Sequence, residues 1–197
     1  TTGENGLTET IEVPAGTYTI EEVGLEGTAL KNFQLYNEGK LSHTYTKKNE
    51  RAYTFEVANA ATGELNVLKT DLAGNAIEDI QFELLFKAFA NSAEMKNAAA
   101  KAPATGYSSI RQGGAQKTIL TTDKDGKLHV SGLTPGWYQL VEQPSKNYVT
   151  AAPRYVKVLY NGASVEVTTA AGYTELNGTA DLTIANTPKG LLTINKK

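Results

Sequence analysis

A lysine, a glutamate and an asparagine in this sequence each end a short run in which every second residue is apolar. Side chains two residues apart on a β-strand point to the same face, so each of these polar side chains lies on the apolar side of its strand. An unpaired charge or amide in a protein core costs several kcal/mol of stability. The pattern therefore predicts that the three meet in the core of one domain: Lys69 after Leu65 and Val67, Glu142 after Tyr138 and Leu140, and Asn186 after Leu182 and Ile184.

Such a meeting allows a covalent reaction. Burial lowers the pKa of a lysine and raises that of a glutamate, so a neutral amine and a protonated carboxyl group can coexist at neutral pH. The Lys69 amine can then attack the side-chain carbonyl of Asn186 and expel ammonia, while Glu142 donates to that oxygen and shuttles protons. Effective molarities of about 10⁵ to 10⁸ M in well-oriented intramolecular reactions provide most of the acceleration. The product is a Lys–Asn isopeptide bond, formed once and without turnover. The alternative is a buried salt bridge beside a satisfied amide.

The same residues recur elsewhere in the chain. One spacing of glycine, tyrosine and glutamate occurs twice: Gly6, Gly16, Tyr18 and Glu22 are spaced as Gly126, Gly136, Tyr138 and Glu142 are. Residues 57–59 and 63–69 recur as residues 184–186 and 190–196. Glu22 and Asn59 are therefore the equivalents of Glu142 and Asn186 in an earlier unit, and Lys196 is the equivalent of Lys69 in a later unit. Each lies in phase with apolar neighbours, as in the central unit.

These repeats predict tandem domains. We expect residues 1–62 to be the C-terminal part of a first domain, residues 63–189 a complete domain of ordinary size, and residues 190–197 the first strand of a following domain. The chain is then a window from a longer array. In a further hypothesis, the tail of one molecule completes the head of another. It is disfavoured because a donated strand would not supply the long stretch between the lysine and the turn glycine of a unit.

Composition excludes several functional classes. The formal net charge is -2 and the pI is about 5.8, which gives no electrostatic reason to expect nucleic acid or an anionic membrane as a partner. No apolar run approaches the roughly 20 residues of a membrane span, and the first residues lack the features of a signal peptide. The chain has no cysteine, which excludes disulfides and thiolate metal sites. We expect no cofactor, no metal and no hydrolase constellation.

Turn signals recur at short intervals along the chain, and apolar residues alternate between them. This pattern predicts short β-strands. Seven or so such strands, interrupted by one helical insertion, indicate an all-β fold of antiparallel sandwich type. The expected strands cover residues 65–70, 79–86, 117–122, 127–131, 136–142, 154–160, 164–169 and 181–186.

Three local features refine this prediction. Residues 88–102 are rich in helix formers and are followed by a proline, which predicts a short inserted helix. Asn161 and Gly162 predict a hairpin with a type I′ turn. Trp137 alternates with Tyr138, so we expect it to face away from the reactive residues, either packed under the inserted helix or on an exposed binding patch, of which packing is favoured.

The residues that carry the chemistry also carry a family resemblance. The run DKDGKLHVSGLTPGWYQLVE, which ends at Glu142, resembles the E-box region of CnaB or SpaA domains, the prealbumin-like modules of Gram-positive pilins and adhesin stalks. LNVLKTD around Lys69 resembles the opening lysine strand of that family, and IANT around Asn186 its closing asparagine strand. The resemblance covers residues 63–189. It implies tandem Ig-like or prealbumin-like sandwiches in which an isopeptide bond joins the first and last strands. No lysine-bearing pilin motif or sortase signal is recognisable.

The resemblance implies a structural module of a pilus, fibre or adhesin stalk on the cell surface or cell wall of a Gram-positive bacterium. Its partners would be neighbouring domains of the same array, pilus subunits or a host ligand. The alternative is a recognition module, in which the insertion at residues 88–116 presents exposed Tyr107 and Arg111 to a host protein or glycan. An exposed apolar patch there would favour recognition, and a polar surface would favour a spacer. A spacer attached to an enzyme is a third alternative.

Overall fold

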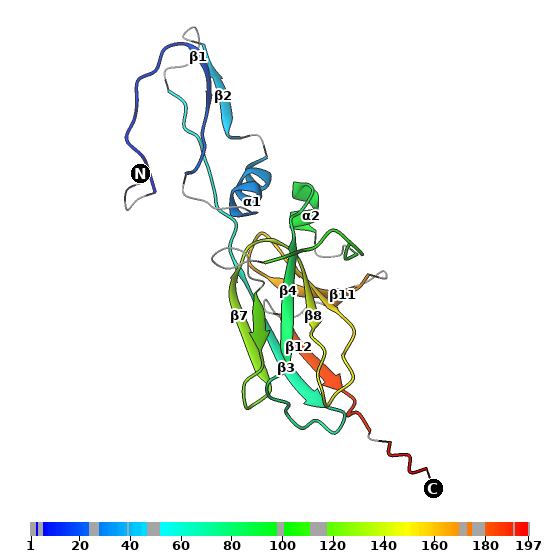
Figure 1. The fold of residues 1–197 in the computed structure, drawn as a ribbon. Helices are drawn as coiled ribbons and strands as arrows, with labels where there is room; N and C mark the ends of the chain where they lie inside the picture. Colours follow the sequence, from blue (N-terminus) through cyan, green and yellow to red (C-terminus); the bar gives the residue numbers. More distant parts are fainter. Residues whose placement is uncertain are drawn as a thin grey trace.

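Two β-sheets face each other across an apolar core in the second half of the chain (Figure 1). The larger sheet has the strand order β11-β10-β9-β8-β4-β5, with β6 also paired to β4, and the smaller has the order β12-β3-β7. The computed structural model describes residues 3, 6–23, 28–38, 40–46, 52–97, 101–110, 118–169, 173–174, 180–190 and 192–196. The strands of the sandwich are β3 Gly63–Asp71, β4 Gln81–Lys87, β5 Ser108–Ser109, β6 Ile119–Thr121, β7 Lys127–Leu133, β8 Gly136–Glu142, β9 Arg154–Val158, β10 Ser164–Val167, β11 Tyr173–Thr174 and β12 Ala180–Asn186.

Alternation of apolar side chains explains this sandwich. On β3 and β12 every second residue is buried, and the buried side chains of the two sheets pack into one hydrophobic core. Burial of this apolar area is the main favourable contribution to folding. The expected β-sandwich is confirmed, and a strand is found at each expected position.

One strand pairing was not expected from the sequence. The pairs among the described strands are antiparallel except β3 with β12, which is parallel, with Leu182 opposite Val67 and Ile184 opposite Lys69. Parallel strands end at the same end of a sheet. The C-terminal ends of the first and last strands of the sandwich therefore lie side by side, and this pairing brings Lys69 near Asn186.

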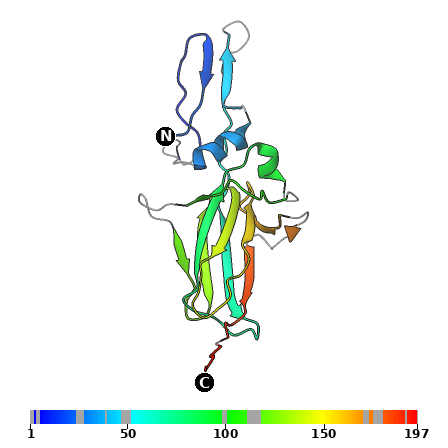
Figure 2. The ribbon, with the colours of Figure 1, turned by 45° about the vertical axis from the view of Figure 1, so that its right-hand side comes forward.

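The N-terminal segment, defined by the described residues 6–59, extends beyond one end of the sandwich (Figures 1 and 2). It contains an antiparallel hairpin of β1 (Gly16–Thr19) and β2 (Ser42–Tyr45), with helix α1 (Thr28–Asn37) between the two strands. Helix α1 was not predicted. Residues 192–196 project from the opposite end of the sandwich, beyond β12 (Figure 1).

Two local predictions need correction. The inserted helix was expected over residues 88–102, and in the described part of this range the helical residues are those of α2 (Ser92–Lys96). Asn91 is an extended N-cap that accepts a hydrogen bond from the Glu94 amide, and Asn97 is again extended. The hairpin at Asn161 and Gly162 exists, but Gly162 alone has a positive φ, of 84°, so the turn is not type I′. The β9–β10 connection is longer than two residues, which explains why the two-residue turn geometry is absent.

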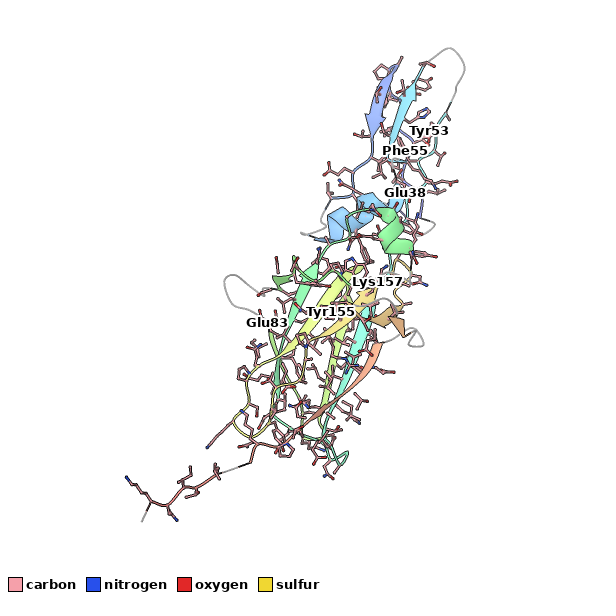
Figure 3. The ribbon with its side chains drawn as sticks, turned by 90° about the vertical axis from the view of Figure 1, so that its right-hand side faces the viewer. Glu38, Tyr53, Phe55, Glu83, Tyr155 and Lys157 are labelled. Carbon is pink, nitrogen blue, oxygen red and sulfur yellow. The ribbon has the colours of Figure 1, made fainter. Side chains whose placement is uncertain are left out.

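The outer face of the larger sheet holds a second apolar cluster. Trp137 is 2% exposed and packs edge-on against Phe89 of the insertion, with ring centroids 5.6 Å apart, so the prediction that it packs under the insertion is confirmed. Lys157 lies on the same face, below α2 (Figure 3), and is fully buried. Its Nζ lies 4.5 Å from the centroid of the Trp137 ring and donates to the main-chain carbonyl of Asn97. This cation–π contact and hydrogen bond compensate a charge that burial disfavours.

Lys157 is expected to make the unfolding free energy depend on pH in the alkaline range. Burial lowers its pKa to about 8, and the Glu94 carboxylate opposes this shift only in part. Between pH 8 and the ordinary lysine pKa of about 10.4, the unfolded chain binds more protons than the folded chain, so stability rises with pH. We expect the unfolding free energy of the wild type, relative to Lys157→Met, to increase by about 2 kcal/mol between pH 7.5 and pH 9.5. Chemical denaturation of both proteins across this range measures the effect, and parallel pH profiles would contradict it.

Candidate functional site

Three strands place Lys69, Glu142 and Asn186 at one end of the sandwich core. Lys69 on β3 and Asn186 on β12 belong to the smaller sheet, where Asn186 is two residues beyond the residue paired with Lys69, so both side chains point to the same face. Glu142 is the last residue of β8 in the opposite sheet. All three side chains are buried: Lys69 is 0% exposed, Asn186 1% and Glu142 4%. All three side chains therefore point into the core, as the sequence pattern predicts.

Lys69 is held by main-chain oxygens. Its Nζ donates to the carbonyl of Ile184 at 2.9 Å and to that of Thr70 at 3.3 Å. Burial lowers the pKa of Lys69, and the Glu142 carboxylate opposes this shift only in part. Loss of a proton turns the ammonium group into an amine with a free lone pair, and the fold favours this form relative to water.

Glu142 holds the amide. Asn186 donates a short hydrogen bond from Nδ2 to Glu142 Oε1, and the Ala151 amide donates to Glu142 Oε2 at 3.4 Å. Asn186 Oδ1 is buried and accepts no hydrogen bond from any described residue. The expected donation from Glu142 to this oxygen is therefore not present, and Glu142 accepts from the amide nitrogen instead. The sequence did not identify Ile184 or Ala151 as members of the site. Both contact the site through main-chain atoms, and such contacts cannot be inferred from residue type.

The contacts differ from those of a simple buried ion pair. Within the described part of the chain, no ion pair joins Lys69 to Glu142, and the amide oxygen of Asn186 is unsatisfied. An unsatisfied buried polar atom has a free-energy cost and calls for an explanation. The arrangement instead combines an amine of lowered pKa, a carboxamide carbonyl and a carboxyl group bonded to that carboxamide, which is the set of groups needed for amide exchange.

The N-terminal segment contains two of the equivalent residues. Asn59 donates from Nδ2 to Glu22 Oε1 at 3.3 Å, as Asn186 donates to Glu142. The hydroxyl of Tyr18 donates to the carbonyl four residues earlier at 2.7 Å, and the hydroxyl of Tyr138 does the same at 2.8 Å. The Glu–Asn pair and the tyrosine contact therefore recur, as the sequence repeat suggests.

The third equivalent lies elsewhere. Lys196 is exposed in the projecting residues 192–196, and the structure does not bring it to Glu22 and Asn59. Asn59 is exposed and Glu22 is half-buried, so the core-facing environment expected for this pair is not present. Among the residues that the structure describes, a Lys–Glu–Asn set comes together only between strands β3, β8 and β12 of the sandwich.

The insertion at residues 88–116 differs from the surface expected of a recognition module. Tyr107 was expected to be exposed, but its ring is partly buried against Tyr155, at 5.9 Å between centroids, and its hydroxyl is buried. Arg111 lies outside the described residues. Among residues 88–97 and 101–110, no large hydrophobic side chain is exposed.

No other chemical centre was found in the described ranges. They contain no cluster of three or more histidine, cysteine or acidic residues placed to hold a metal ion. Asp123 caps a tight turn, where its Oδ1 accepts from the amides of Asp125 at 2.9 Å and Lys127 at 2.8 Å. The helices of the described chain are all too short or too polar to cross a bilayer.

Comparison with known proteins identifies one matching family. The family described as SpaA, prealbumin-like fold domain, matches residues 63–172, a range that includes Lys69 and Glu142 and ends before Asn186. No curated protein matches the chain in sequence.

Several solved structures are also similar. The full-length major pilin SpaD from Corynebacterium diphtheriae is 18% identical over 65% of this chain and 30% of its own, with a TM-score of 0.45. The pilus adhesin RrgA from Streptococcus pneumoniae is 23% identical over 66% of this chain and 16% of its own, with a TM-score of 0.44. The minor pilin GBS52 from Streptococcus agalactiae is 21% identical over 70% of this chain and 49% of its own, with a TM-score of 0.38. The chain thus spans less than half the length of each of these proteins.

Proposed function

The chain belongs to the SpaA family of prealbumin-like fold domains, and from this premise we propose that it is a structural module of a cell-surface pilus, fibre or adhesin stalk. We propose further that an isopeptide bond between Lys69 and Asn186 stabilises the module. Its location would be the surface or wall of a Gram-positive bacterium, and its partners the neighbouring domains of an array and other pilus subunits. The bond forms once in each domain, so the chain acts as a self-modifying structural protein rather than as an enzyme.

A single observation carries the proposal for the bond. A buried lysine of lowered pKa shares the core with a carboxamide whose Nδ2 contacts Glu142 and whose Oδ1 has no partner among the described residues. A structural salt bridge would pair the lysine with Glu142 and satisfy the amide. The observed contacts favour the reaction over the salt bridge.

The reaction is balanced in atoms and charge. The neutral amine Nζ of Lys69 attacks Cγ of Asn186, a new C–N bond forms, and the bond from Cγ to Nδ2 breaks. The attacking nitrogen loses one proton and the leaving nitrogen gains one, so the product is a secondary amide and one molecule of ammonia. Glu142 contacts Nδ2 and is placed to pass this proton to the leaving group. No cofactor, metal or external reagent is required.

Peptide mapping tests the proposed linkage. Trypsin cleaves after free lysines and does not cleave after a lysine whose amine is acylated. We expect digestion of the unfolded wild type to give one branched peptide that joins the sequence around Lys69 to the sequence around Asn186. Two separate linear peptides, with cleavage after Lys69, would contradict the proposal. Cleavage after Lys124, an exposed lysine, serves as an internal control for complete digestion.

Recognition through the insertion is the second proposal, and it has less support. An adhesive surface requires exposed groups that a partner can bury. The described parts of residues 88–116 expose no large apolar side chain, and Tyr107 is partly buried. A host ligand, if the whole protein binds one, is better sought outside these described parts.

A further inference from the structure

The insertion that carries α2 contacts the N-terminal segment as well as the sandwich. Phe89 and Met95 of the insertion are fully buried on the outer face of the larger sheet, with Trp137. Leu35 and Tyr36 of α1 pack against this same cluster. Figures 1 and 2 show α1 and α2 side by side at the junction between the N-terminal segment and the sandwich. One apolar cluster therefore spans both sides of the junction.

Polar contacts add directional constraints to this cluster. Lys96 of α2 forms an ion pair of 2.9 Å with Glu38, which follows α1, and its Nζ lies 5.7 Å from the centroid of the Tyr36 ring. The Tyr36 ring is stacked on Tyr160 of the sandwich, with centroids 5.7 Å apart and an interplanar angle of 23°. Asn32, which is 2% exposed, donates to the main-chain carbonyl of Pro135. Side chains from one helix thus contact two separate parts of the sandwich.

The connecting chain is also fixed at both ends. The Asn37 side chain makes two hydrogen bonds with the main chain of Ala58, of 2.9 and 3.1 Å, which tie the end of α1 to the connection. The Ala61 amide donates to the carbonyl of Tyr160 at 2.8 Å, and Ala61 forms a parallel bridge with Asn161. A connection with its main-chain groups bonded on both sides has little freedom to act as a hinge.

We propose that residues 89–97 of the insertion are a clamp that binds the helix of the preceding unit and fixes the orientation of successive units. The partner of this surface is an amphipathic helix that presents an aromatic ring to Lys96 and an acidic group at its C-terminal end, as α1 presents Tyr36 and Glu38. Domains joined by short connections move relative to one another unless their interface is large and apolar. The shared cluster provides an apolar contact across the junction, the ion pair and hydrogen bonds add polar ones, and Lys157 donates to the Asn97 carbonyl beneath the clamp. The inference does not depend on the isopeptide bond.

Distance measurements between two spin labels test the clamp. The chain contains no cysteine, so Gln34→Cys on α1 and Lys124→Cys in the distant turn of the sandwich provide two unique attachment sites, both exposed. We expect a single narrow distance distribution in this doubly labelled chain. Adding Tyr36→Ala and Lys96→Ala removes the stacking, the cation–π contact and the ion pair. The width of the distribution should then increase by about twofold or more, because an unrestrained domain pair samples many orientations.

A matched control removes the same residue types away from the junction. Tyr53→Ala changes an exposed tyrosine of the N-terminal segment, and Lys101→Ala an exposed lysine of the insertion. The control should keep the narrow distribution. Circular dichroism of each variant shows whether the sandwich has still folded. Two outcomes would overturn the proposal. One is a broad distance distribution before any clamp residue is changed, and the other is an unchanged width in the folded Tyr36→Ala, Lys96→Ala variant.

Discussion

The purified wild-type chain is expected to weigh one ammonia less than its sequence requires, and Lys69→Ala is expected to have its full calculated mass. The physical reason is that Lys69, Asn186 and Glu142 are buried at the same end of one core, so the reaction needs no diffusional encounter. Each molecule either forms the bond and loses one ammonia, or keeps its full mass. Intact-mass spectrometry of the denatured protein resolves the difference directly.

Two variants sharpen this measurement. Lys157→Met removes the other fully buried lysine and should lose ammonia as the wild type does, because Lys157 lies on the opposite face of the larger sheet. Glu142→Gln keeps the shape of the site but removes the proton shuttle, which should slow bond formation by about 10²- to 10⁴-fold. Freshly purified Glu142→Gln should therefore have its full mass. A folded wild type with its full mass would exclude the bond and leave a buried polar cluster.

Side-chain parity made the sandwich and its candidate site predictable. Because a strand repeats every two residues, the positions of Lys69, Glu142 and Asn186 within apolar runs were enough to place them in the core, and the structure buries all three. The same reasoning placed Trp137 on the opposite face from Tyr138, under the insertion. These predictions use local geometry, which the sequence specifies directly.

Nonlocal contacts were not predictable in this way. Parity does not say which strands pair, so the parallel pairing of β3 with β12 appeared only in the structure. Helix α1 was missed because its stability depends on tertiary packing: Phe33 and Asn32 are buried at 4% and 2% exposure. The equivalents Glu22 and Asn59 show the limit of parity, since Ile20 and Val57 beside them are 37% and 45% exposed. The alternation of apolar residues along a strand defines an apolar face, but that face is buried only where another part of the protein packs against it.

The parallel pairing determines how force would pass through the sandwich. A pull on both ends of the chain enters β3 at its first residue, Gly63, and leaves from β12 after Asn186. Because β3 and β12 run parallel, the pull would shear one strand along the other. A bond from Lys69 to Asn186 would carry the force across after only the first residues of β3. The residues between Lys69 and Asn186 would then stay outside the path of the force.

Force spectroscopy should therefore separate the wild type from a variant without the bond. We expect the wild-type sandwich to show no unfolding step before the tether detaches. Lys69→Ala should unfold with a step on the order of 400 Å, because about 120 residues at roughly 3.4 Å each become available for extension. Lys157→Met should retain the bond and behave as the wild type. If molecules that lack one ammonia still release the full step, the ammonia was lost without joining Lys69 to Asn186, and the proposed linkage would be wrong.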